Sequence, residues 1–263
     1  MWELLLPLFG FLIVIVASMT GVGGGTFFVP LLTLAYGFFP AYAVGTSLLV
    51  IIFAGLSATV GFALQKRVYF KTGLLLALAT IPGSVVGAFL TSVLPGDVLG
   101  LVFGVFLVVM AVRMVAASGA WQKKKPKQDT VKAVCCEHDL FLNRKRLAAG
   151  VCLGFFGGLV SGLLGVGGGI LLVPIMTLFL LMPMHAAVAT SMFTMIFTSL
   201  SGVAQHLTLG NVNLEYGLLL AVGALAGAQV GAKVCTRTSA AKLSLIFGVL
   251  VLIVSVQMIV KFI

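Results

Sequence analysis

Charged side chains are scarce in this sequence. Only 8% of its 263 residues are Asp, Glu, Lys or Arg, whereas 61% are hydrophobic. Soluble domains are about 25% charged, so a soluble fold is excluded. Apolar runs fill nearly the whole length, and the short alternating segments of a strand barrel are lacking. We therefore expect an all-α polytopic protein of a cell membrane, either the inner or the plasma membrane.

Acidic residues are few, and none of them lies deep in an apolar run. The six are Glu3, Asp97, Asp129, Glu137, Asp139 and Glu215. A proton relay or a cation site inside a membrane is normally built from buried carboxylates, and the sequence has none to use. This absence favours an anion or a neutral solute over a cation.

Nucleotide and cofactor signatures are also lacking. No G-x-x-x-x-G-K-[ST] sequence is present, so the chain is not expected to hydrolyse ATP. Residues 21–26 match a dinucleotide fingerprint only in part and follow an apolar run rather than a strand. The net charge of +10 is concentrated in a few loops, which indicates topology control rather than nucleic-acid binding. We expect no cofactor and no nucleic-acid partner.

The cysteines form no paired C-x-x-C motif. They are Cys135, Cys136, Cys152 and Cys235. Cys135 and Cys136 are adjacent to each other, which is a poor spacing for metal ligands despite the nearby His138, so no metal site is expected. No spacing brings Cys152 close to a histidine as a nucleophile would require, so we do not expect an enzyme.

Glycine, in contrast, is abundant and arranged in a repeat. The sequence Gly-Val-Gly-Gly-Gly occupies residues 21–25 and again residues 165–169, 144 positions later (165 − 21). The same offset relates Thr46-Ser47 to Thr190-Ser191, Ser57 to Ser201, Gly73 to Gly217, and Gly87-Ala88 to Gly231-Ala232. Such a register indicates two copies of one unit. We expect a first membrane repeat at 1–117, a basic linker at 118–146 and a second repeat at 147–263.

Each repeat opens with an apolar stretch that the glycines interrupt, at 4–37 and 147–182. A continuous helix of that length would measure about 51 Å, against a hydrocarbon core of about 30 Å. Because three neighbouring glycines hold a helix poorly, we expect a helical hairpin with the glycines at its apex. Three ordinary spans should follow in each copy, at 43–64, 72–92, 99–117, 186–208, 216–234 and 243–262.

Loop charges predict how the repeats are oriented. The lysine-rich linker 118–146 should be cytoplasmic, and so should the basic loops 65–71 and 235–242. The corresponding loops 93–98 and 209–215 contain no basic residue and should lie outside. Equivalent loops thus carry opposite charge patterns, which favours inverted repeats with both termini outside.

The glycine clusters are candidate anion sites. The helix that starts after each cluster directs its free N–H groups and positive dipole end towards the glycines. The Thr-Ser pairs begin the next spans and have hydroxyls that could bind an anion, and Gln229 is a polar side chain within a span. The predicted substrate-binding residues are Gly23, Gly24, Gly25, Thr26, Thr46, Ser47, Gly167, Gly168, Gly169, Ile170, Thr190, Ser191 and Gln229.

Each of these features also has a purely structural explanation. Glycines at four-residue spacing, as at 150–162 and 223–231, allow close helix packing. Serine and threonine hydroxyls often bond to their own helix. Gln205 and His206 lie near a span end, where an interfacial role is an alternative. If the clusters are sites, replacing Gly25 or Gly169 by valine should block the ligand and leave the fold intact.

The paired Gly-Val-Gly-Gly-Gly clusters, each followed by Val-Pro and then by Gly-Thr-Ser or Ala-Thr-Ser, resemble the sulfite exporter TauE/SafE family. The resemblance covers nearly the whole chain. It implies a multi-pass permease for small anions such as sulfite, thiosulfate or a sulfonate. The alternatives are an anion channel or facilitator for another substrate, and a non-transporting membrane enzyme or scaffold. Whether the chain forms a homo-oligomer stays open.

Overall fold

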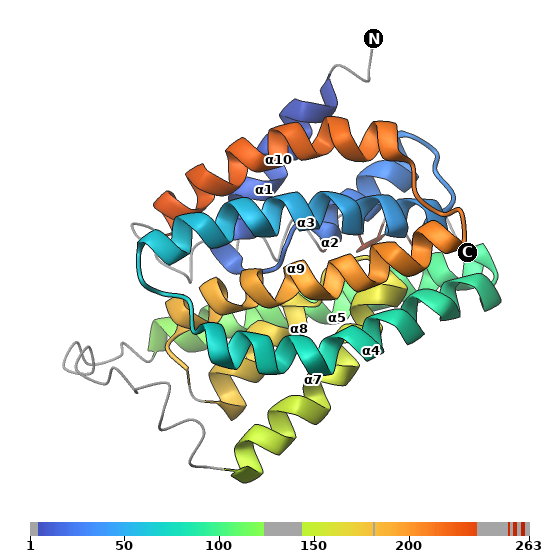
Figure 1. Cartoon of the computed structure of the whole chain (residues 1–263). Helices are drawn as coiled ribbons and strands as arrows, with labels where there is room; N and C mark the ends of the chain where they lie inside the picture. Colours follow the sequence, from blue (N-terminus) through green and yellow to red (C-terminus); the bar gives the residue numbers. More distant parts are fainter. Residues whose placement is uncertain are drawn as a thin grey trace.

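The structure is a computed structural model that describes residues 5–123, 144–180 and 182–235, together with residues 252, 255, 256, 259 and 260. All regular structure within these residues is helical, as predicted (Figure 1). The first half contains α1 (Leu6–Thr20), α2 (Gly25–Pro30), the π-helix η2 (Leu31–Ala35), α3 (Pro40–Leu64), α4 (Phe70–Val93) and α5 (Gly96–Lys123). The second contains α7 (Arg144–Leu164), α8 (Gly169–Pro174), the π-helix η4 (Ile175–Phe179), α9 (Met184–Thr208) and α10 (Leu214–Val234).

Four helices in the described part of the chain are long and apolar enough to cross a membrane. They are α3, α4, α9 and α10, with 25, 24, 25 and 21 residues. These helices confirm four of the predicted spans, each extended by two or three residues at its start. The predicted span 99–117 lies within α5. The predicted span 243–262 falls mostly outside the described residues, as do Cys135, Cys136 and His138.

Both opening stretches are broken at the glycines. In the first, α1 ends at Thr20, Gly21 adopts φ 74°, and Gly24 adopts φ 84° immediately before α2. In the second, Gly165 and Gly168 adopt φ 69° and 80° at the equivalent places. These left-handed conformations are nearly free for glycine and costly for other residues, which explains the glycines at these four positions. We call residues 21–24 the first joint and residues 165–168 the second joint.

The prolines do not mark the helix starts. The helix after the first joint begins at Gly25, and Pro30 is its last α-helical residue, before the π-helix at Leu31–Ala35. Pro174 precedes η4 in the same way. Because proline has no N–H and its ring crowds the preceding turn, the α-helical pattern is interrupted there and a wider turn follows.

The two repeats are interlocked rather than separate. Helix α1 packs along α10 of the other repeat, and α7 packs along α4. A Cβ on Gly158 or Gly162 would overlap the α4 backbone, and one on Gly223 or Gly227 would overlap the α1 backbone. The prediction that these glycines allow close helix packing is therefore confirmed.

Residue pairs across the interfaces show the direction of each helix. Ser57 of α3 and Gln65, directly after α3, bond to Leu225 and Ala232 of α10, so these helices run parallel. Helices α4 and α9 are parallel as well, because Gly73 bonds to Thr194 and Ser84 to Thr198. By contrast, α3 and α9 are antiparallel neighbours (Figure 1). Gly45 lies beside His206, and Gly55 lies beside Met192 and Ile196.

Candidate functional site

The first and second joints lie directly against each other. A Cβ built on Gly25 would overlap the carbonyl oxygen of Gly165, and one built on Gly169 would overlap the carbonyl oxygen of Gly21. The two contacts are related by the 144-residue offset, with the roles of the repeats exchanged. Reciprocal contacts of this kind are those of a two-fold arrangement. The sequence placed the joints in separate repeats, and the structure brings them together.

Two serines hold each joint to a helix of the other repeat through hydrogen bonds. Ser47 Oγ lies 2.8 Å from the carbonyl oxygen of Gly165, and Ser191 Oγ lies 3.1 Å from that of Gly21. Each hydroxyl also lies within 2.9 Å of a carbonyl in its own helix. A hydroxyl has one proton to donate. An anion bound by Ser47 or Ser191 would therefore have to replace one of these carbonyl acceptors.

The neighbouring threonines hold the loops that precede α4 and α10. Thr190 Oγ1 accepts a hydrogen bond from the Tyr69 amide at 3.1 Å, and Thr46 Oγ1 accepts one from the Asn213 amide at 3.0 Å. These bonds are again related by the repeat offset. Both threonines are completely buried, so each Thr-Ser pair fastens one repeat to the other.

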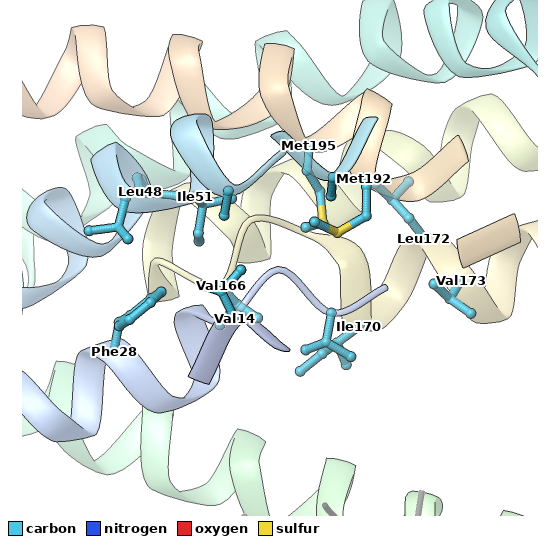
Figure 2. Close-up of a cluster of buried hydrophobic side chains, with 14 of the residues drawn as sticks. Val14, Phe28, Leu48, Ile51, Val166, Ile170, Leu172, Val173, Met192 and Met195 are labelled. Atoms are coloured by element: carbon cyan, nitrogen blue, oxygen red, sulfur yellow. The ribbon is translucent and has the colours of Figure 1, made fainter. Parts of the chain in front are cut away.

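The joints lie beside the middle of two candidate spans and are surrounded by apolar side chains. Ile51 of α3 and Met195 of α9 are equivalent by the offset, and both lie next to Gly23 and Gly167. Figure 2 shows these two side chains over the joints, with Val166 and Ile170 nearby. Both Ile51 and Met195 are fully buried, so the joints are enclosed in this conformation.

Three hydroxyls near the joints are buried without a hydrogen-bond partner. They belong to Ser18, Thr26 and Ser161, all 0% exposed. Ser18 precedes the first joint and Thr26 follows it, whereas Ser161 lies one turn before the second joint. Ile170, the counterpart of Thr26, has no hydroxyl. Buried polar groups are normally paired, so an unpaired hydroxyl at each of these places indicates space for a polar ligand or water. Ser18 and Ser161 were missed in the sequence because lone serines in apolar runs are common.

Comparison with known proteins identifies the family. The family model described as "Sulfite exporter TauE/SafE" matches residues 6–258. The chain belongs to this family. "Probable membrane transporter protein YunE" of Bacillus subtilis is 32% identical over 252 residues, which is 93% of this chain and 92% of that protein. "Probable membrane transporter protein MJ0441" of Methanocaldococcus jannaschii is 28% identical over 254 residues, covering 90% and 88%. No solved structure is detectably similar.

Membership agrees with the composition and helices of the chain. The four long apolar helices and the family match establish a multi-pass membrane transporter. The resemblance noticed in the glycine and Thr-Ser motifs is thereby confirmed. Within the described part of the TauE/SafE chain, the joints bring together broken helices, buried hydroxyls and residues of both repeats.

Gln229, another predicted binding residue, is held by α3. Its Nε2 donates to the Ser57 carbonyl at 2.6 Å and lies 3.1 Å from Ser57 Oγ. An amide within a span needs such a partner, and Ser57 supplies it. The bond explains the position of Gln229 in the TauE/SafE chain without a ligand, and a role in binding stays a prediction.

His206 is not an interfacial residue, contrary to the alternative considered from sequence. Its side chain is 0% exposed, and Nε2 lies 3.1 Å from the Gly162 carbonyl oxygen of α7. Its Nδ1 is buried without a partner. The sequence suggested an interfacial role because His206 is only two residues from the end of α9. It could not show that the neighbouring helix α7 covers that end.

The expectation that valine at Gly25 or Gly169 would leave the fold intact also needs correction. Neither residue has a positive φ, so backbone conformation is not what restricts them. Even one added carbon would overlap the backbone of the facing joint. A valine should therefore push the joints apart, and lost transport in these variants would not by itself identify a binding site.

Proposed function

We propose that this protein is a secondary permease for a small inorganic or organosulfur anion, such as sulfite, thiosulfate or a sulfonate. The anion binds between the two joints, near the middle of the membrane. The observation that carries this proposal is the group of unpaired buried hydroxyls of Ser18, Thr26 and Ser161 around the joints.

The electrostatics of the joints favour an anion. Helices α2 and α8 begin immediately after them, at Gly25 and Gly169. The first N–H groups of a helix have no partner within it, and they carry the positive end of the helix dipole. Two such ends converge because the joints are in contact. The described acidic residues, Asp97 and Glu215, lie in the first turns of α5 and α10, and neither is deep in a span.

We propose that the repeats are inverted, with the two-fold axis in the plane of the membrane. The antiparallel contact between α3 and α9 supports this, because these helices are repeat equivalents and both are candidate spans. Inverted repeats that place two broken helices at the midplane are a common transporter design. The enclosed joints favour a gated carrier over an open channel.

The basic linker 118–146 is proposed to be cytoplasmic and the protein to reside in the inner or plasma membrane. Lysine and arginine dominate the linker, and such loops are retained on the cytoplasmic side. The two membrane repeats are proposed as 1–117 and 147–263. The predicted binding residues of both joints, the Thr-Ser pairs and Gln229 form the proposed site.

Transport assays test the proposal. Purified full-length protein in proteoliposomes should take up radiolabelled sulfite or thiosulfate, and unlabelled methanesulfonate should compete. Thr26→Val removes one unpaired hydroxyl at nearly constant volume, and we expect the KM to rise about tenfold for the loss of one hydrogen bond to a charged group. The control is Thr208→Val, since this exposed hydroxyl bonds only to Gln205 of its own helix.

Two results would refute the proposal. Absence of flux and of binding for the whole anion panel would favour an enzyme or a scaffold. Equal KM values in Thr26→Val and Thr208→Val would remove the buried hydroxyl from the site. Accumulation of the anion against its gradient, in the presence of an ion gradient, separates a coupled permease from a channel.

A further inference from the structure

The short loop 65–69, between α3 and α4, is fixed between the end of α10 and the start of α9. Gln65 Nε2 donates to the Ala232 carbonyl at 3.1 Å. The Tyr69 amide donates to Thr190 Oγ1 at 3.1 Å. Thr190 adjoins Ser191, which bonds to Gly21 of the first joint. The loop is therefore linked to the first joint through two adjacent residues of α9, Thr190 and Ser191.

Arg67 directs its side chain into this region. Its Nη1 has almost no exposed surface and no hydrogen-bond partner, and the residue as a whole is partly buried. The guanidinium lies within electrostatic range of both His185, at the start of α9, and Cys235, at the end of α10. Cys235 Sγ in turn lies 3.5 Å from the Met19 carbonyl, two residues before the first joint.

No described acidic residue neutralises this guanidinium. Asp97 and Glu215 are the acids in the described chain, and each lies in the first turn of another helix, α5 and α10. An arginine in partly buried surroundings normally has a carboxylate or several carbonyl partners, because an uncompensated charge is costly to desolvate. A buried Nη1 without a partner is therefore a vacant donor of the kind that oxyanions accept.

The second repeat lacks this feature. The loop at 209–213 makes the same backbone turn, with Asn211 bonded to His206 as Arg67 is bonded to Phe62. However, Arg67 is replaced there by the neutral Asn211. Lys66, at φ 55°, occupies the position of Gly210, at φ 69°. The first repeat thus places two cations in a turn where its counterpart has none, even though a left-handed lysine is conformationally unfavourable.

We propose that Arg67 binds the transported anion at the entrance to the first joint, on the loop 65–69 face only. This inference rests on the proposed function and adds an entry residue to it. The planar guanidinium matches an oxyanion with two parallel N–H donors, a geometry that lysine cannot reproduce. An anion arriving from this face binds Arg67 first and then moves past Ser191 to the joints.

Kinetics in proteoliposomes test the role of Arg67 with a matched control in the same loop. We expect Arg67→Gln to raise the KM for thiosulfate about tenfold, with kcat changed less than threefold. Arg67→Lys should fall between, because it keeps the charge and loses the paired donors. Lys66→Gln, which removes an exposed charge next to it, should leave KM within twofold. The effect should be larger for the dianion thiosulfate than for the monoanion methanesulfonate.

A second measurement does not depend on an arginine variant that folds. Burial raises the pKa of the Cys235 thiol, and the nearby Arg67 charge lowers it. An anion bound to Arg67 cancels that lowering, so saturating methanesulfonate should shift the pH profile of Cys235 alkylation upward. Iodoacetamide is a suitable neutral reagent, in a protein whose other cysteines are replaced by serine.

The outcomes are separable. If the wild type carries no anion, the proposed function fails. If the wild type carries thiosulfate but Arg67→Gln and Lys66→Gln have the same KM, Arg67 is not an entry residue. If Arg67→Gln cannot be purified, an alkylation profile that does not respond to methanesulfonate at concentrations that inhibit thiosulfate flux overturns the inference in the same way.

Discussion

At the scale of single residues, the glycines of the two clusters have two different physical roles. Gly21, Gly24 and their counterparts adopt left-handed conformations that other residues reach only at a cost. Gly25 and Gly169 have no such conformation, and they face the carbonyl oxygens of Gly165 and Gly21. The sequence shows four glycines within five residues, and only the packing separates turn glycines from contact glycines.

Alanine at the contact glycines should destabilise the protein. In Gly25→Ala or Gly169→Ala the new methyl group overlaps backbone that cannot rotate away, and overpacking of this kind costs about 1–3 kcal/mol. Thermal unfolding in detergent should show a clearly lower Tm. Gly157→Ala is the control, since its Cβ would meet only Leu171, at 3.8 Å, and helix propensity favours alanine. A Tm equal to that of the wild type in both joint variants would show that the joints can separate freely.

At the scale of elements, each joint is held to a helix of the other repeat by a serine hydrogen bond, from α3 or α9. Ser47 reaches Gly165 over 118 positions, and Ser191 reaches Gly21 over 170. The sequence predicted that the Thr-Ser pairs matter, because both copies retain them. It could not predict their partners, since periodicity places a residue on a helix face and does not show which distant backbone meets that face.

Removal of either serine hydroxyl should loosen the joints. Ser47→Ala leaves the Gly165 carbonyl without this donor, and an unpaired buried polar group costs about 1–3 kcal/mol. Ser191→Ala should behave alike. Ser92→Ala provides the comparison, because this exposed hydroxyl bonds only to Phe89 of its own helix. If the three variants unfold at the same temperature, the serine hydrogen bonds to the joints contribute nothing measurable to stability.

The interface between α4 and α9 has hydroxyls at three positions where the repeat-equivalent interface, between α10 and α3, has alanines. Thr80 and Thr198 share a hydrogen bond of 2.6 Å, and Ser84 donates to the Thr198 carbonyl at 2.8 Å. The equivalent positions of Thr80, Ser84 and Thr198 are Ala224, Ala228 and Ala54. The duplication was recognised from residues that are identical in the two repeats. Such a comparison does not draw attention to positions where the repeats differ, as these three do.

A double-mutant cycle measures what this bond contributes. Thr80→Ala and Thr198→Ala, alone and combined, should give a coupling free energy of about 0.6 kcal/mol, the average for hydrogen bonds between membrane helices. Chemical unfolding of the four proteins in the same detergent supplies the numbers. A coupling near zero would mean that each threonine finds another acceptor when its partner is removed; Thr198 already lies 3.2 Å from the Thr194 carbonyl.

At the scale of the whole molecule, composition and the 144-residue offset predicted the class of protein, four of the spans and the broken helices. They did not predict that α1 packs on α10 and α7 on α4. Two repeats in a sequence suggest two separate helical bundles side by side. Here the first helix of each repeat packs against a helix of the other repeat. The glycine spacing of α7 and α10 predicted close helix packing. It could not predict which helix packs there, because glycine has no side chain that would specify a partner helix.

The orientation of the repeats in the membrane can be tested by labelling the ends of α3 and α9. Leu64 ends α3 and is 81% exposed, and its counterpart Thr208 ends α9 and is also exposed. Because α3 and α9 are antiparallel, their equivalent ends should lie on opposite sides of the membrane. In a cysteine-free background, a membrane-impermeant maleimide should label Leu64→Cys from the cytoplasmic side and Thr208→Cys from the outside. Phe70→Cys, across the short loop from Leu64, should share the side of Leu64→Cys. Labelling of positions 64 and 208 from the same side would exclude inverted repeats. The proposed anion site would then fail too, because it depends on two helix N-termini that converge from opposite halves of the membrane.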